Sequence, residues 1–304
     1  MDLPRSHHFN PQFALRRWVG SDGMLCEMRL IDGVVHRRRK HPRRTGAVRD
    51  LYRVDGVAEA NSQDLEIKFM SPLDGEAAVV LERLITGQTL TLDQRIAFAR
   101  FLLSMLYRNP DHVGTIKTHM EEMWHEATAA LEPDFAKMQA ARGLPITTLA
   151  EETAKRDPGA AGKSFANMVT DVIADSRAVP DIVAMPWMVI DVSKSRFSLL
   201  TSDRPLILST SLADPLCYIA LPLSPTELFI ASHDQRYAKS LPTKAHTTIV
   251  RAMNVDVVRQ AREFVWGSDD TQMRLVQNRI RTTPDRVILS DEQRQEALAV
   301  ARGA

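Results

Sequence analysis

The stretch PWMVIDV, residues 186–192, marks the point where the sequence changes from helical to strand-forming patterns. It is rich in β-branched and aromatic residues, which are enriched in strands. Further short runs of this kind follow, separated by Asp, Ser and Pro: FSLLTS (197–202), PLILST (205–210), CYIALPL (217–223) and ELFIAS (227–232). Runs of this length between turn-forming residues are typical of strands. We therefore expect a small, antiparallel sheet in the second half of the chain.

The middle of the chain has the periodicity of helices. Apolar residues repeat at helical spacing over 73–84, directly after Pro72, which suits the first turn of a helix. Residues 91–94, Thr-Leu-Asp-Gln, have the spacing of a capping box and predict the start of a second helix, which Pro110 ends. A longer helix is expected over 112–142.

Two local signals organise the N-terminal part. Asn10 and Pro11 predict the start of a helix running through Val19, because an asparagine side chain caps early amides and proline suits the first helical position. Asp32 and Gly33 supply the positive backbone angles of a tight turn between two apolar runs, MLCEMRL and VVHRRR. The second signal predicts a β-hairpin.

The order of these elements predicts an α+β fold, predominantly helical, because strands and helices are grouped rather than alternating as βαβ units. We expect a single domain over residues 1–304, with a helix-rich part at about 62–178 and a sheet-containing part at about 180–304. The segment 143–160 is expected to be a loop or a weak boundary. After the sheet, EFVWGS (263–268) predicts a short strand, and two terminal helices are expected to follow.

Composition places the chain among ordinary globular proteins. Its 39 basic and 38 acidic residues nearly cancel, so affinity for a polyanion would have to come from local clustering of charge. Cys26 and Cys217 provide neither a disulfide framework nor a cysteine-rich metal site, and this usage suits a reducing compartment. The apolar stretch IVAMPWMVI (182–190) is too short to cross a bilayer. We expect a soluble, cytoplasmic protein without a membrane partner.

The segment HRRRKHPRR, residues 36–44, concentrates positive charge and contains no acid. Six side chains are candidates for contact with nucleic acid or another polyanion: Arg37, Arg38, Arg39, Lys40, Arg43 and Arg44. The segment offers no aromatic interleaving for base stacking, so we do not expect it to read sequence. The alternative is a solvated ribbon tip and loop.

Two segments resemble known functional motifs, but each matches its motif only in part. DPGAAGKS (157–164) ends like a phosphate-binding loop, but Asp157 stands where the first glycine belongs, and the preceding TTLAEETAKR (147–156) is polar and helical in pattern rather than a buried strand. Glu122 and His125 have the spacing of a di-iron ligand pair, but the sequence contains no second pair. We expect a helix-to-helix turn in the first case and an exposed helix face in the second. Serine-triad chemistry is disfavoured because no Gly-x-Ser-x-Gly elbow occurs.

His7 and His8 stand just before the expected Pro11 helix. The positive end of a helix disfavours imidazolium, and neutral imidazole is the form that binds metals or accepts protons. Histidine is also a common capping and packing residue, so a structural role remains open for both.

Spaced pieces of the chain together resemble a known family. They are HHFNPQFALRRW (7–18), YRNP (107–110), LLTSDRPLIL (199–208), LPLSP (221–225) and MNVDVVRQAREFVW (253–266). In this order they resemble domain-of-unknown-function family 4238, whose members have a His-His-x-x-Pro-x-Phe opening, an Arg-x-Pro after a helix, a Ser-Asp-x-Pro on a strand and a late Asn-led helix. The resemblance covers most of the chain and implies no settled activity.

The resemblance implies a set of shared residues: His7, His8, Pro11, Phe13, Arg108, Ser202, Asp203, Pro205 and Asn254. Glu76 stands where the family often has a helical glutamate. It falls at the edge of the apolar stripe of its helix, where it could face a cleft.

These residues suggest one polar site made of His7, His8, Glu76, Arg108 and Asp203. His8, Glu76 and Asp203 could hold a divalent metal or act as acid and base, with His7 in support, and Arg108 could clamp a phosphate. The same inventory fits a structural network in which Arg108 bridges Asp203.

Three hypotheses follow from the sequence. The first is a metal-assisted hydrolase acting on nucleic acid or another phosphoester. The second is a non-catalytic module that binds nucleic acid or protein through residues 36–44. In the third, the shared residues are purely structural.

Overall fold

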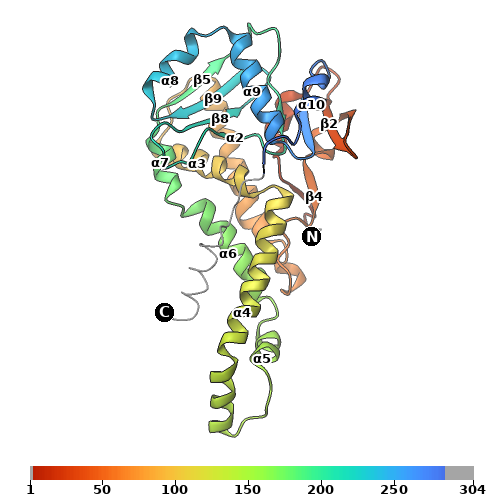
Figure 1. Ribbon diagram of the computed structural model, residues 1–304, viewed down its shortest axis with the longest axis vertical. Coiled ribbons are helices and arrows are strands. Elements are labelled where there is room, and N and C mark those ends of the chain that lie inside the picture. Colours follow the sequence, from red (N-terminus) through yellow and green to blue (C-terminus); the bar gives the residue numbers. More distant parts are fainter. Residues whose placement is uncertain (1–2, 285–304) are drawn as a thin grey trace.

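The computed structural model describes residues 3–284 and confirms the α+β class. A body contains the larger sheets, and a stem of helices extends away from it (Figure 1). The stem is built from α4 (Pro110–Arg142), α5 (Leu149–Arg156) and α6 (Ala160–Ala174). Strand pairs within the described residues are antiparallel.

The sheet expected in the second half of the chain is confirmed. Its strands, in spatial order, are β5 (Trp187–Asp191), β9 (Glu227–Ser232), β8 (Tyr218–Pro222) and β7 (Ile207–Leu208). Phe229 faces a core that includes Phe98, and Leu228 faces a second core that includes Ile249. Because both faces of the sheet are covered, its two central strands, β9 and β8, are continuous apolar runs rather than alternating ones.

The N-terminal hairpin is confirmed, with Asp32 and Gly33 at φ 47° and 80° in its turn. It is part of a larger sheet whose strands, in spatial order, are β3 (Val34–Lys40), β2 (Leu25–Ile31), β10 (Phe264–Gly267) and β6 (Thr201–Ser202). The run FSLLTS therefore ends in the hairpin sheet and not beside β5. The pairing of β10 with β2 brings the two halves of the chain together.

The described helices follow the expected order. The remaining ones are α1 (Gln12–Leu15), α2 (Ser71–Ile85), α3 (Leu92–Tyr107), α7 (Ala178–Ala184), α8 (Gln235–Ser240), α9 (His246–Gln260) and α10 (Met273–Arg279). Short helical turns lie at Arg16–Trp18, Pro42–Arg44, Glu59–Asn61, Glu66–Met70 and Leu241–Thr243. The capping box of Thr91 and Gln94 is present at α3. Within residues 3–284, no helix is both long and apolar enough to span a bilayer.

The cap expected at Asn10 was wrong, and the helical pattern of 147–156 is confirmed inside a segment otherwise expected to be a loop. Asn10 does not cap α1: its Nδ2 donates to the Ser202 carbonyl at 2.9 Å, and α1 is a single turn followed by a 3-10 turn. The segment 143–160 contains α5, with a capping box formed by Thr148 and Glu151. The second expected terminal helix would lie in 285–304, outside the described residues.

The DPGAAGKS segment forms the start of α6 and its glycines serve packing. Lys163 Nζ lies 2.8 Å from Asp157 Oδ1, so the lysine is ion-paired rather than presented to a ligand. A Cβ atom on Gly162 would lie 2.4 Å from the carbonyl oxygen of Asp55. Glycine at this position therefore allows α6 to approach the neighbouring backbone closely.

Candidate functional site

Arg108, directly after α3, is the centre of a buried polar network. Its side chain is 1% exposed, and its Nη1 and Nη2 donate to both carboxylate oxygens of Asp74 at 2.7 and 2.9 Å. Nη2 also donates to the His8 carbonyl at 3.1 Å. Burial opposes the charged guanidinium, but Asp74 and Tyr52 raise the pKa of Arg108 above its ordinary value. Arg108 thus joins the strand β1 (Ser6–His8) to α2, and its carboxylate partner is not the expected Asp203.

His7 is fully buried, and both its ring nitrogens are hydrogen-bonded. Nδ1 accepts the Tyr52 amide at 2.9 Å, so the proton lies on Nε2, which donates to the Pro4 carbonyl at 3.0 Å. The His7 ring stacks on Tyr52, whose hydroxyl donates to the Arg108 carbonyl at 3.0 Å. His7 has no lone pair left for a metal or a substrate proton, and its role is structural.

The tentative metal-ligand set is not assembled. Within residues 3–284, no three His, Cys, Asp or Glu side chains are arranged to hold a metal ion. His8 is half-buried, and burial, followed by the charge of Arg108, lowers its pKa. Glu76 is exposed on α2, whereas Asp74 reaches Arg108. Two residues along a helix differ by about 200° in direction, which explains why one carboxylate faces the network and the other faces solvent.

Asp203 belongs to a separate arrangement at the start of β10. Its carboxylate accepts the backbone amides of Arg262, Glu263 and Phe264 at 3.0, 2.7 and 3.0 Å. Burial raises the pKa of Asp203 to about 6, although the three amides favour the ionised form. Asp203 therefore anchors β10 beside β6.

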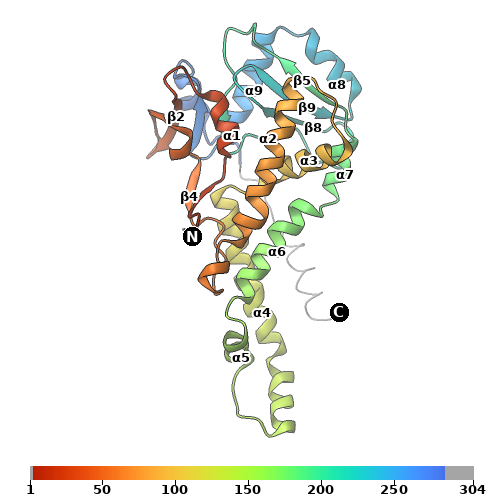
Figure 2. The same ribbon diagram turned by 180° about the vertical axis from the view of Figure 1, so that it is seen from behind.

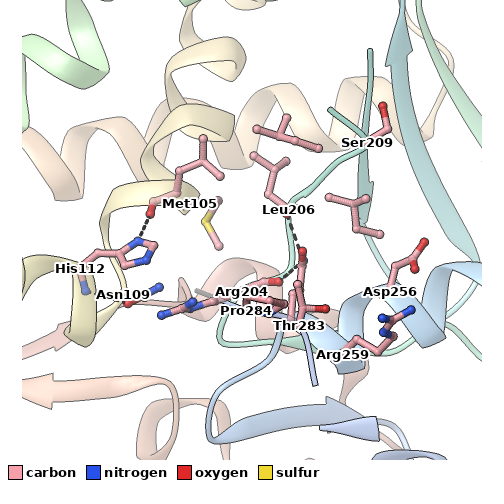
Figure 3. A pocket seen from close by; sticks show the side chains of 14 residues that line it. Met105, Asn109, His112, Arg204, Leu206, Ser209, Asp256, Arg259, Thr283 and Pro284 are labelled. Atoms are coloured by element: carbon pink, nitrogen blue, oxygen red, sulfur yellow. Dashed lines mark hydrogen bonds between the residues drawn. The ribbon is translucent and has the colours of Figure 1, made fainter. Parts of the chain in front are cut away.

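A pocket of about 290 Å³ opens next to these two networks (Figure 3). It lies between the corner of α3 and α4, the segment 204–209 and α9. Its apolar wall is formed by Met105, Leu106, Leu206, Ile207 and Leu208. Its polar side chains are Asn109, His112, Arg204, Ser209, Asp256, Arg259, Gln260 and Thr283, and Pro284 also lines it.

Asn109 and His112 each bring a buried polar atom without a hydrogen-bond partner in residues 3–284. Asn109 Oδ1 accepts the His112 amide at 3.0 Å and so caps α4, which leaves the donor Nδ2 unsatisfied. His112 Nδ1 donates to the Leu106 carbonyl at 2.5 Å, which leaves Nε2 as an unsatisfied acceptor. Burial, followed by the charge of Arg204, lowers the pKa of His112 to about 4, so the ring is neutral at pH 7.

Two arginines line the pocket, and each has an acidic neighbour. Arg204, the variable residue of the Ser-Asp-x-Pro motif, lies beside Asn109 and His112 (Figure 3), and its Nη2 donates to Asp111 at 3.2 Å. Arg259 lies on α9 close to Asp256 (Figure 3). Burial raises the pKa of Asp256, while Arg259 partly offsets this effect. A group bound at the Arg204 end of the pocket would therefore meet a guanidinium as well as Asn109 and His112.

Two residues that line the pocket directly follow residues selected from the sequence. Asn109 follows Arg108, and Arg204 follows Asp203. The selected residues hold the backbone in place, and the adjacent ones present their side chains to the cavity. Polar residues cluster around Arg-x-Pro (108–110) and Ser-Asp-x-Pro (202–205), and this clustering was the sequence signal for a site. Sequence alone does not show which residue of each motif faces a cavity.

Some basic residues of segment 36–44 form ion pairs within the fold, and others do not. Arg37 pairs with Asp270, and Arg39 Nη2 lies 2.5 Å from Asp22 Oδ1. Arg39 also donates to the backbone carbonyls of Met24 and Ser268. These two arginines are therefore part of the folded framework, while Arg38, Lys40, Arg43 and Arg44 have no ion pair within residues 3–284.

Comparison with known families supports the resemblance seen in the sequence. The model of the family described as "Protein of unknown function (DUF4238)" matches residues 6–271. No curated protein and no solved structure matches the chain.

Proposed function

Since the chain belongs to the DUF4238 family of proteins of unknown function, we propose a function from the site itself: the pocket binds a small phosphoester. The observation that supports the proposal is the pair of unsatisfied buried atoms, Asn109 Nδ2 and His112 Nε2, at the end of the cavity where Arg204 lies. A buried polar atom without a partner is costly, and native structures contain few of them. A bound ligand would satisfy both atoms.

The chemistry of the pocket indicates the class of ligand. A phosphate oxygen would accept from Asn109 Nδ2 and from the guanidinium of Arg204, since charge-assisted bonds from arginine suit phosphate. Neutral His112 would accept from a hydroxyl, either of the ligand or of a monoprotonated phosphate. The organic part of the ester would lie against the apolar wall of Leu206 and Met105. A cavity of about 290 Å³ is at the lower end of the size of small-molecule sites, which favours a compact ligand.

Hydrolysis of the bound ester is a second candidate, favoured by the unsatisfied Nε2 of neutral His112. In this version Nε2 takes the proton of a water molecule whose oxygen attacks phosphorus, and the bond from phosphorus to the ester oxygen breaks. The leaving ester oxygen takes a proton from solvent and departs as the alcohol, and His112 returns its proton to solvent. His112 would then take the base role first considered for His8. Release of phosphate from phenyl phosphate, and its loss in His112→Gln, would support hydrolysis; binding without release would restrict the function to recognition.

Calorimetric titration with phenyl phosphate tests the binding proposal. Asn109→Asp keeps the oxygen that caps α4, but it replaces the unsatisfied donor with a negative charge. Loss of a hydrogen bond to a charged group corresponds to about a 10- to 100-fold weaker affinity. Asn278→Asp, an exposed position on α10, makes the same change of charge outside the pocket and should bind like the wild type.

Two results would contradict the proposal. One is the absence of phenyl phosphate binding by the wild type. The other is equal affinity of Asn109→Asp and Asn278→Asp. Phenol, which lacks the phosphate, should bind far more weakly than phenyl phosphate if the Arg204 end supplies most of the affinity.

A further inference from the structure

The basic residues of β3 lie on both faces of the strand. In a strand, alternate side chains point to opposite faces, so Arg37 and Arg39 share a face with the buried Val35. On that face both arginines meet acids, Asp270 and Asp22. Their charge is neutralised within the fold.

Arg38 and Lys40 lie on the opposite face. Arg38 is in register with Glu27 on β2, and Glu27 is in register with Trp266 on β10, so these three side chains share one face of the sheet. Lys40 is two residues from Arg38 and therefore lies on the same face.

Arg43 and Arg44 extend this face. They occupy the turn Pro42–Arg44 and are exposed. Thr45, the next residue, donates to the carboxylate of Glu27 and accepts from Trp266 Nε1 at 2.8 Å. These contacts bring the turn to the Arg38 side of the sheet. Glu27 is buried and bonded to Thr45, so it is not presented to solvent beside the cations.

We propose that this surface, defined as Arg38, Lys40, Arg43 and Arg44, binds the backbone of double-stranded nucleic acid. It lies at an edge strand on the side of the body away from α8 (Figure 2), and it is separate from the pocket. Four cations without ion pairs in the described residues can each contact a phosphate. Residues 36–44 contain no Phe, Tyr or Trp on which unpaired bases could stack, which favours a duplex over a single strand.

The number of cations sets the dependence on salt. Each phosphate contact contributes about −0.9 to the slope of log affinity against log salt for duplex DNA, so four contacts predict a slope of about −3.6. The affinity should therefore fall about 150-fold between 50 and 200 mM salt. Removal of one contact should make the slope less negative by about 0.9.

Fluorescence anisotropy with a labelled 20-base-pair DNA duplex tests the proposal. Arg38→Gln should make the slope less negative by about 0.9, the contribution of one phosphate contact. Arg37→Gln, which changes the adjacent arginine paired with Asp270, should leave the slope unchanged. Arg43→Gln is a second variant with the same expectation as Arg38→Gln, and it tests the surface from outside the strand. Melting curves of each variant show whether the fold is retained.

Several outcomes would overturn the proposal. They are a slope near zero for the wild type, an equal loss of slope in Arg37→Gln and Arg38→Gln, and binding to vesicles containing phosphatidylserine without binding to the duplex at the same salt concentration. The last outcome would reassign the surface to membranes. None of these results would bear on phosphoester binding in the pocket, because the pocket contains none of the four cations.

Discussion

Replacement of Asp74 by alanine should destabilise the protein by about 3 kcal/mol. The Arg108 side chain is 1% exposed, and its guanidinium donates to both oxygens of Asp74. Removal of one partner from a buried ion pair costs about 3–5 kcal/mol, because the remaining charge stays buried and unpaired. The Asp74 side chain is 21% exposed, so water can partly replace the carboxylate, and we expect the lower end of this range.

Urea-induced unfolding, followed by circular dichroism, measures this change as a difference in the free energy of unfolding. Glu76→Ala is the matched control on the same helix, because its carboxylate is exposed, and a surface substitution of this kind is expected to change stability by less than about 0.5 kcal/mol. A loss below about 1 kcal/mol in Asp74→Ala, or equal losses in the two variants, would refute the view that Arg108 depends on Asp74 for its burial.

Two further predictions concern pH and packing. The pKa of His112 is lowered to about 4, so between pH 6.5 and 4 the unfolded chain binds a proton that the folded chain does not. Stability should therefore fall by at most about 3 kcal/mol as the pH falls through this range, and His112→Gln should flatten the fall in urea-unfolding measurements at several pH values. Gly162→Ala should destabilise α6 by about 1–3 kcal/mol, because its Cβ would collide with the Asp55 carbonyl oxygen. Lys163→Ala should cost less than about 1 kcal/mol, because it removes only an exposed ion pair, and a loss in thermal melting equal to that of Gly162→Ala would contradict the packing role of the glycine.

Local signals in the sequence predicted the elements that depend on a few adjacent residues. The capping box of Thr91 and Gln94 starts α3 as expected, and Asp32 and Gly33 form the hairpin turn. In each case the side chain or backbone angle that forms the element lies within one turn of it. The short apolar runs after Pro180 likewise predicted a sheet in the second half of the chain.

Partners distant in sequence were not predictable from such signals. Asn10 has the right composition for a cap, but a carbonyl 192 residues away takes its amide instead. The hairpin is extended by β10 because a strand edge pairs with whichever segment the packing brings beside it. Local sequence shows which hydrogen bonds a residue is able to form, but tertiary packing determines which partner it has.

The candidate site shows the same division. The sequence by itself determined that polar residues gather around Arg108 and Asp203, and that six cations lie in 36–44. Only the tertiary structure decided that Asp74 rather than Glu76 meets Arg108. It also placed Asn109 beside a cavity. The reason is physical: burial and charge pairing depend on which face of each element is covered, and that is set by contacts between segments far apart in the chain.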